Sequence, residues 1–202
     1  GPGSGPIGVV KELEPFLPVP VVERKDDQYV LSNDRPDSIG RVHSFYGNFL
    51  VMVRAYTYIK MLGAEGLKDV ADYAVLNANY LRVRLKEHYN LPVDRTCMHE
   101  FVINDEGLPN HVTTNDIAKR LLDYGYHAPT VYFPLIIPGA MMIEPTETES
   151  IETLDEFVNA MAAIREEAEN SPQKVLEAPQ NTPVKRVDAV TAARKPVLKW
   201  EE

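Results

Sequence analysis

The alternation of apolar and polar positions divides the first half of the chain into a hairpin and two helices. Residues 19–22 and 29–31 are extended apolar runs on either side of the charged turn 25–27, and this spacing predicts a hairpin. Residues 45–62 are apolar on nearly every side and predict a buried helix that ends at Gly63. A second helix is predicted because apolar residues recur at steps of three and four: Leu67, Val70, Ala71, Ala74, Ala78, Leu81 and Leu85.

The second half of the chain contains shorter elements. Strict alternation over residues 95–104 predicts a strand. Thr114 is a suitable N-cap and Gly125 a suitable terminator for a short helix between them. The apolar runs 131–133 and 140–143 predict two further strands, which we expect to join the first in one small antiparallel sheet.

A long helix is predicted after Ser150, which is placed to cap it. Its buried stripe consists of Leu154, Phe157, Val158, Met161, Ile164 and Ala168. The order of elements predicts an α+β fold, with helices on one face of a small antiparallel sheet. We therefore expect a glycine-rich loop and hairpin over 1–42, an α+β domain over 43–170, and an irregular proline-rich tail over 171–202.

Charge and composition exclude several classes of partner. The net charge of −9 argues against nucleic acid, whose phosphates require clustered Lys and Arg. Arg54 and Lys60 interrupt the one apolar stretch that approaches the roughly 18 residues of a membrane helix, so no membrane segment is expected. We see no secretory signal. The single cysteine, Cys97, fits a reducing compartment, and the cytoplasm is the expected location.

Metal binding and thiol catalysis are both disfavoured by spacing. None of the histidines forms the closely paired ligand pattern of a zinc site: His43, His88, His99, His111 and His127. Cys97 and His99 share a face of the predicted strand, but side chains two residues apart on a strand point in parallel rather than at each other. We expect no metal, and a packing or hydrogen-bonding role for this pair is favoured over a nucleophilic one.

Two polar groups allow more than one interpretation. Three glutamates precede the last helix and form either an acid–base group or, as favoured here, negative charge near a helix N-terminus: Glu144, Glu147 and Glu149. A second group gathers in the segment between a predicted helix and strand: Tyr124, Tyr126, His127 and Tyr132. Such loops often carry function, and packing at the sheet edge is an equal alternative.

Short segments from both ends and the middle of the chain together resemble one family. They are the opening Gly-Pro-Gly-Ser-Gly-Pro-Ile-Gly-Val, Ser38-Ile39-Gly40, residues 43–49, 97–101, 132–135, 144–150, 181–184 and 193–198. The chain is similar to glycine dehydrogenase (decarboxylating), the P-protein of the glycine cleavage system, in the C-terminal part of its subunit 2.

This resemblance implies a pyridoxal 5′-phosphate (PLP) enzyme of fold-type I, of which the chain would supply the end of the large domain and the small C-terminal domain. The implied enzyme decarboxylates glycine and passes the aminomethyl group to the lipoyl arm of H-protein. The implied partners are glycine, P-protein subunit 1 and lipoylated H-protein, within a homo- or hetero-oligomer.

The resemblance also implies which residues serve the active site. The Schiff-base lysine of the family stands in a histidine–lysine motif that this chain does not contain, so we expect no catalytic residue in it, no bound cofactor and no activity of the chain alone. Gly3 and Gly5 would let the backbone approach the cofactor closely. The implied active-site lining consists of Ser44, Tyr46, Asn48, His99, His127 and Glu147.

Two alternatives stay open from the residues. One is an α+β interaction or dimerisation domain without catalysis, since an exposed apolar face over 45–62 would promote self-association. The other is a fragment of a different fold-type I enzyme, an aminotransferase or a cysteine desulfurase. Those enzymes hold the substrate carboxylate with an arginine of the small domain, and none lies between Arg120 and Arg165.

Overall fold

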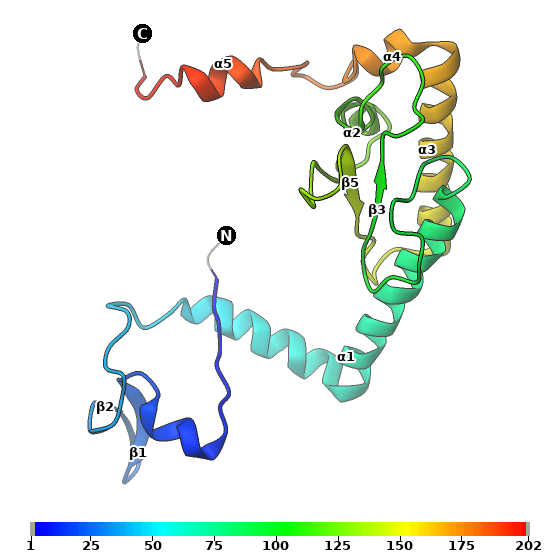
Figure 1. The fold of residues 1–202 in the computed structure, drawn as a ribbon. Helices are drawn as coiled ribbons and strands as arrows, with labels where there is room; N and C mark the ends of the chain where they lie inside the picture. The colour runs from blue at the N-terminus through cyan, green and yellow to red at the C-terminus, as the bar shows by residue number, and fades with distance from the viewer. Residues whose placement is uncertain (1–2, 201–202) are drawn as a thin grey trace. The chain divides into compact units, whose positions relative to one another are not determined.

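The computed structural model describes residues 3–200, and they divide into two units, Gly1–Ala64 and Glu65–Glu202. Gly1 and Pro2, at the start of the glycine-rich run, lie outside the described residues. Figure 1 shows that the first unit carries a hairpin and the second carries a sheet with most of the helices. Within residues 3–200, no helix has both the length and the apolar character needed to cross a membrane.

The first unit contains the predicted hairpin. A 3₁₀ helix, η1 (Lys11–Phe16), precedes strands β1 (Val21–Lys25) and β2 (Gln28–Ser32), which pair antiparallel. Asp26 adopts a positive φ of 55° in the turn between the strands, a conformation that Asp tolerates better than most residues. The hairpin prediction is therefore confirmed.

Helix α1 (Phe49–Leu85) is interrupted at Gly63, where φ is 65° and ψ is −169°. The predicted helix end at Gly63 is confirmed, because only glycine adopts this backbone conformation without strain. The predicted burial of residues 45–62 is wrong for this structure: Leu50 is 75% exposed and Met61 81% exposed. The described residues do not cover this side of the helix.

The second unit is built on an antiparallel sheet of three strands. These are β3 (Phe101–Asn104), β4 (Thr130–Val131) and β5 (Ala140–Ile143), in the order β3-β5-β4. In Figure 1, helix α3 (Ile151–Asn170) and the second part of α1 run along one side of this sheet. The prediction of an α+β fold with a small antiparallel sheet and helices on one face is confirmed.

The first of these strands is shorter than its sequence pattern predicts. The alternation begins at Arg95, but β3 starts only at Phe101. Ahead of it, the Asn79 side chain donates to the Cys97 carbonyl at 2.8 Å and accepts from the Cys97 amide at 3.1 Å. The Asn79 side chain thus pairs with the backbone N–H and C=O of Cys97, which in a sheet would pair with a neighbouring strand. The predicted shared strand face of Cys97 and His99 is therefore wrong.

Helix α2 (Thr114–Asp123) begins with a reciprocal cap. Its N-cap is Thr113 rather than the predicted Thr114: Thr113 Oγ1 accepts from the Asp116 amide, and Asp116 Oδ2 accepts from the Thr113 amide at 2.9 Å. Two otherwise unpaired backbone donors are satisfied in this way. The predicted end at Gly125 is confirmed by its φ of 83°.

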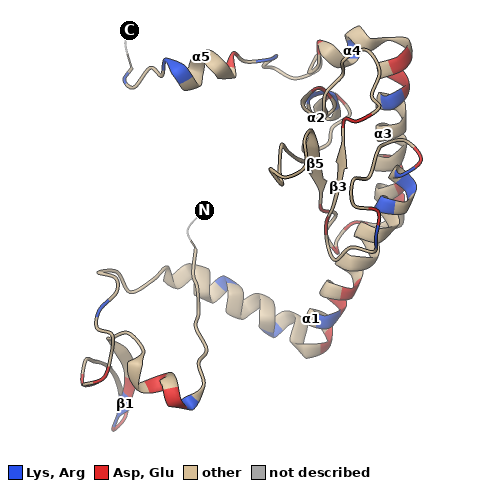
Figure 2. Ribbon diagram, viewed as in Figure 1, with Lys and Arg blue, Asp and Glu red and all other residues tan. Residues whose placement is uncertain are grey.

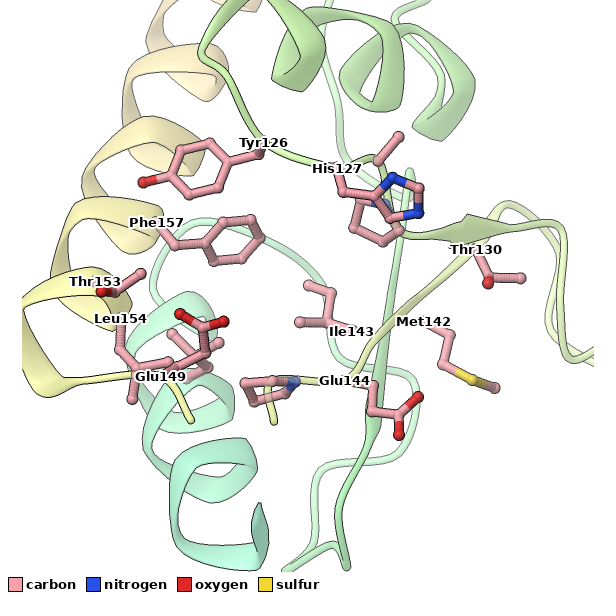
Figure 3. A pocket seen from close by; sticks show the side chains of 14 residues that line it. Tyr126, His127, Thr130, Met142, Ile143, Glu144, Glu149, Thr153, Leu154 and Phe157 are labelled. Atoms are coloured by element: carbon pink, nitrogen blue, oxygen red, sulfur yellow. The ribbon is translucent and has the colours of Figure 1, made fainter. Parts of the chain in front are cut away.

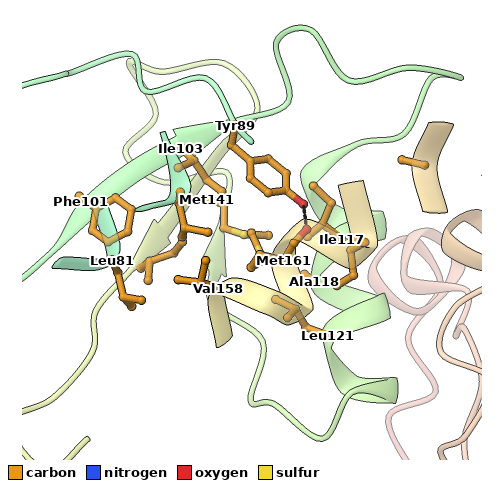
Figure 4. Close-up of a cluster of buried hydrophobic side chains, with 14 of the residues drawn as sticks. Leu81, Tyr89, Phe101, Ile103, Ile117, Ala118, Leu121, Met141, Val158 and Met161 are labelled. Carbon is orange, nitrogen blue, oxygen red and sulfur yellow. Dashed lines mark hydrogen bonds between the residues drawn. The ribbon is translucent and has the colours of Figure 1, made fainter. Parts of the chain in front are cut away.

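The hydrophobic core lies in the second unit, between the sheet and its helices (Figure 4). Tyr89 donates its hydroxyl to the Met161 carbonyl at 2.8 Å within it. The predicted cap at Ser150 is confirmed, and so is the buried stripe of α3 apart from Phe157, which is only partly buried. The largest fully buried apolar side chains are Leu81, Leu85, Ile103, Ile117, Leu121, Met141, Met161, Ile164 and Val175.

The C-terminal segment is more ordered than the predicted irregular tail. It contains two short helices, α4 (Pro172–Leu176) and α5 (Ala189–Arg194). Val175 and Ala178 are fully buried, so the start of this segment belongs to the core. The proline content of this segment favoured an irregular structure and did not predict these helices. Pro172 occupies the first turn of α4, where a proline is tolerated.

Candidate functional site

A cavity of about 440 Å³ opens in the second unit, where three chain segments meet α1 (Figure 3). The segments are the loop after α2, the end of β5 with the residues that follow it, and the first turns of α3. Most of the lining is apolar. Its members are Leu81, Tyr126, His127, Ala128, Pro129, Thr130, Met142, Ile143, Glu144, Pro145, Glu149, Thr153, Leu154 and Phe157.

The loop after α2 places Tyr126 and His127 at the cavity. Gly125, with its left-handed φ of 83°, reverses the chain, and the Tyr126 amide then donates back to the Leu121 carbonyl at 3.0 Å. This is the arrangement that commonly closes a helix. The path of the chain after α2, and with it the position of Tyr126 and His127, is therefore fixed by the way the helix ends.

An aromatic pair forms one wall. The rings of Tyr126 and Phe157 meet edge to face, with centroids 5.2 Å apart and an interplanar angle of 76°. Burial raises the pKa of Tyr126, and the negative charges of Glu156 and Glu149 raise it further. Tyr126 therefore stays protonated and uncharged at neutral pH, so it offers a neutral hydroxyl and an aromatic ring.

Glu149 is held at the cavity through its backbone. Asn77 of α1 donates from Nδ2 to the Thr146 carbonyl at 2.9 Å and to the Glu149 carbonyl at 3.3 Å. The next residue, Ser150, caps α3 by accepting from the Thr153 amide. In Figure 3 the Glu149 carboxylate points toward the Phe157 ring. Two backbone anchors thus fix the position of the loop that carries this carboxylate.

A second carboxylate and two histidines complete the polar lining and its surroundings. Glu144 Oε1 lies 4.0 Å from His99 Nε2, and both side chains are more than half exposed. In Figure 3, His127 and Glu144 lie at different edges of the cavity.

The predicted site residues of this unit separate into three cases. His127 lines the cavity, and His99 lies beside Glu144, which does. Glu147 belongs to the same loop but does not line the cavity. Sequence reasoning assigned Glu149 to a helix N-terminus and did not single out Asn77. A polar Asn77 on the apolar face that also carries Ala74 and Leu81 was the available signal.

The predicted site residues of the first unit lie on exposed segments. Asn48 Nδ2 donates to the Gly3 carbonyl at 2.9 Å, which brings two of them together. The guanidinium of Arg41 lies 5.6 Å from the centre of the Tyr46 ring. A Cβ added to Gly3 or Gly5 would meet no atom within 4 Å. The roles predicted for Gly3, Gly5, Ser44, Tyr46 and Asn48 stay predictions.

The described residues differ from those that a metal ion or PLP requires. No group of three or more His, Cys, Asp or Glu within residues 3–200 is arranged to hold a metal ion. No Lys or Arg is among the residues that line the cavity, whereas Glu144 and Glu149 are. PLP requires a lysine amine and a positive or amide-rich cradle for its phosphate. The cavity residues of this chain therefore do not fit PLP.

Comparison with known proteins identifies the family. The family model described as glycine dehydrogenase, C-terminal domain, matches residues 70–187, more than half of the chain. The chain belongs to this family. The matched region contains the whole cavity lining and its anchor Asn77. A fragment of an aminotransferase or a cysteine desulfurase is thereby set aside.

Relatives within the glycine dehydrogenase family extend beyond the chain. It is 60% identical to the probable glycine dehydrogenase (decarboxylating) subunit 2 of Caldanaerobacter subterraneus subsp. tengcongensis, over 99% of the chain and 41% of that protein. The protein of the same name from Halalkalibacterium halodurans is 58% identical, over 100% of the chain and 42% of that protein. The chain thus spans about two fifths of the length of these relatives.

A solved structure supports the fold. A crystal structure of glycine decarboxylase (P-protein) of the glycine cleavage system, in inhibitor-bound form, matches 76% of the chain and 37% of that chain with a TM-score of 0.62. Its sequence identity to this chain is 20%. The match agrees with the C-terminal fold expected of the glycine dehydrogenase family.

Proposed function

We propose that this chain is the C-terminal part of a PLP-dependent glycine dehydrogenase (decarboxylating), which decarboxylates glycine and transfers the aminomethyl group to the lipoyl arm of H-protein. The observation that carries the proposal is 60% identity, along 99% of the chain, with a relative of that name. Because such relatives are more than twice as long as the aligned region, the activity is assigned to a longer protein. Its partners would be subunit 1 and lipoylated H-protein, in the cytoplasm.

PLP, when bound by the complete enzyme, supplies an electron sink for decarboxylation. The cavity residues of this chain do not provide its lysine or its phosphate site, so no step is assigned to them through the cofactor. The backbone of the glycine-rich run, at Gly3 and Gly5, is the part of this chain proposed to approach the cofactor. The chain alone is expected to be inactive, because no lysine in it follows a histidine.

The role proposed for the second unit is to supply part of the active-site wall. His127 lines a cavity whose shape is fixed by the end of α2 and by Asn77. A neutral imidazole offers one donor and one acceptor, which suits orientation of a substrate or transfer of a proton. His99, Glu147, Ser44, Tyr46 and Asn48 are proposed as further lining residues of the complete active site.

The test is exchange of labelled bicarbonate into the glycine carboxyl group. The longer subunit that contains this chain is co-expressed with its partner subunit and assayed with lipoylated H-protein. We expect exchange in the complex and none with residues 1–202 alone. Replacing His127 by Asn is expected to lower exchange about 100- to 10,000-fold, the usual contribution of a proton-transferring group.

The matched control is His111→Asn, at an exposed histidine outside the cavity with a positive φ of 59° that Asn tolerates. Its exchange should equal that of the unaltered complex. An H127N complex that is fully active would remove the proposed role of His127. A complete complex that shows no exchange would instead favour the non-catalytic interaction domain.

A further inference from the structure

The cavity has a net negative polar lining. Glu144 and Glu149 both line it, and no lysine or arginine does. Among the ion pairs of residues 3–200, the only partner of Glu144 is the half-exposed His99, at 4.0 Å, and Glu149 has none. Two carboxylates without a cationic side chain between them favour a positively charged guest and repel an anion.

Most of the remaining residues that line the cavity are apolar. Leu81, Ile143 and Leu154 are buried core residues that also face the cavity, and Met142 is half-buried beside them. The volume of about 440 Å³ corresponds to roughly fifteen waters at about 30 Å³ each. Glycine, with five non-hydrogen atoms, would leave most of this space unfilled. The cavity therefore suits a guest with an apolar portion as well as a charge.

The aromatic wall favours the same guest. The Tyr126 and Phe157 rings belong to this wall, and the face of an aromatic ring attracts alkyl groups and cations because it carries negative partial charge. Glu149 points toward Phe157 (Figure 3), so a cation that pairs with this carboxylate would also lie near the ring. An ammonium group can donate three hydrogen bonds, enough for carboxylate, hydroxyl and carbonyl acceptors together.

We propose that this cavity is a binding site for a primary alkylammonium: a protonated amine carried on a short apolar chain. Glu149 pairs with the ammonium group, Glu144 adds negative potential at the cavity edge, and Met142, Ile143 and Leu154 contact the chain. Asn77 is a positioning residue, since it acts by fixing the backbone on either side of Glu147.

The inference deepens the proposed function, since amines are the substrates and products of the proposed enzyme. It rests on that function only because it treats the cavity as part of the active site. Binding is measurable on residues 1–202 without cofactor or turnover. A failure to bind amines and a failure to exchange bicarbonate are therefore separate results.

The experiment titrates the chain with n-butylammonium, n-butanol and butyrate, three probes of similar length that differ in charge. The methyl resonances of Met142 and Ile143 report occupancy by NMR. We expect saturable shifts with n-butylammonium at an affinity about tenfold above that of butanol, and no saturable shift with butyrate.

Replacement of Glu149 by Gln should weaken n-butylammonium binding about fivefold, equivalent to about 1 kcal/mol, and leave butanol binding unchanged. Glu166→Gln, on the exposed side of the same helix, is the control and should change neither affinity. Asn77→Ala should weaken amine binding through loss of the loop position. Equal affinity for the three probes, or binding by E149Q equal to that of the unaltered chain, would overturn the proposal.

Discussion

Arg120 and Glu167 form a two-point ion pair between α2 and α3, with Arg120 Nε and Nη2 each 2.8 Å from a different carboxylate oxygen. The side chains are only 13% and 16% exposed. Hydrogen bonding to Glu167 is the main cause that raises the pKa of Arg120, so the guanidinium stays charged throughout the ordinary pH range. Such fork-shaped pairing fixes the relative position of two helices as well as their contact.

Loss of one partner of this pair should destabilise the second unit. Glu167→Ala leaves a poorly solvated guanidinium without its main acceptor, and we expect a loss of about 2 kcal/mol in the free energy of unfolding. Urea denaturation followed by circular dichroism measures it. The control is Lys68→Ala, which removes an exposed pair with Asp72 on α1 and should cost less than about 0.5 kcal/mol. Equal effects of the two substitutions would contradict the assigned role.

Asp123 should make stability depend on acid pH. Burial opposes its ionisation, but the backbone amides of Asn181 and Gln180, together with Arg120, outweigh this and hold its pKa below the ordinary 3.8. A depressed folded-state pKa means that the stabilisation is present above about pH 4 and is lost as pH falls through the folded-state value. Asp123→Asn should therefore cost about 2 kcal/mol at pH 7, and the deficit should shrink below pH 3.8.

Urea denaturation at several pH values from 7 to below 3 tests this dependence. Asp27→Asn, at a side chain that is 97% exposed, serves as the control and should show no such trend. A deficit in D123N that stays constant across the acid range would show that the charge of Asp123 is not what holds Gln180 and Asn181.

Tyr89 should produce the opposite pH dependence. Burial is the main cause that raises its pKa above the ordinary 10.0, while Arg165 acts weakly in the other direction. Stabilisation by a group with a raised folded-state pKa is complete below the unfolded value and is lost as pH rises above it. Tyr89→Phe should cost about 1 kcal/mol at pH 7, through loss of the bond to the Met161 carbonyl. The difference from the unaltered chain should narrow above about pH 10.

Thermal unfolding of the Tyr89→Phe variant between pH 7 and pH 11 provides the measurement. Tyr73→Phe is the matched control, because Tyr73 is 56% exposed on α1. If the two variants lost stability in parallel at every pH, burial of the Tyr89 hydroxyl would not explain the alkaline behaviour.

Two glycines of α1 should respond oppositely to alanine. Gly63 has a φ of 65°, so Gly63→Ala introduces strain of at least about 1 kcal/mol. Gly66 lies three residues later in helical conformation, where alanine should stabilise by about 0.5–1 kcal/mol. Helix content at 222 nm during urea unfolding distinguishes the two. A stabilising Gly63→Ala substitution would indicate a continuous helix through residue 63.

The exposed apolar side of α1 should drive self-association of the isolated chain. Leu50 and Met61 are 75% and 81% exposed, and a patch of such side chains is uncommon on a monomer. Replacing both by Gln should shift the sedimentation-velocity distribution toward monomer. Leu76→Gln, at a 61% exposed leucine of the second unit, is expected to have little effect.

Local patterns in the sequence predicted the elements that depend on local interactions. The hairpin around Asp26 and the helix after Ser150 follow from turn and cap chemistry and from a regular apolar period. The strand expected from Arg95 failed because Asn79, far away in sequence, supplies the backbone partners of Cys97. No local pattern reports such a contact.

The candidate site was only partly predictable for the same reason. His127 was reached through its family motif and lines the cavity, and its role in the active site stays a prediction. The joint presence of Glu144 and Glu149 at one cavity depends on where β5 ends and how Asn77 holds the next loop. These are tertiary relationships, whereas the local sequence favoured the interpretation of the glutamates as negative charge near a helix N-terminus.

The break in α1 at Gly63 falls one residue before the boundary of the two units, and every residue that lines the cavity lies after it. The apolar core shares this property, since its buried members begin at Ala78. The residues that line the cavity and the residues of the core therefore lie in one contiguous stretch of sequence. Such a stretch can be inherited, recombined or fused as a unit, and its amine selectivity would be expected to travel with it.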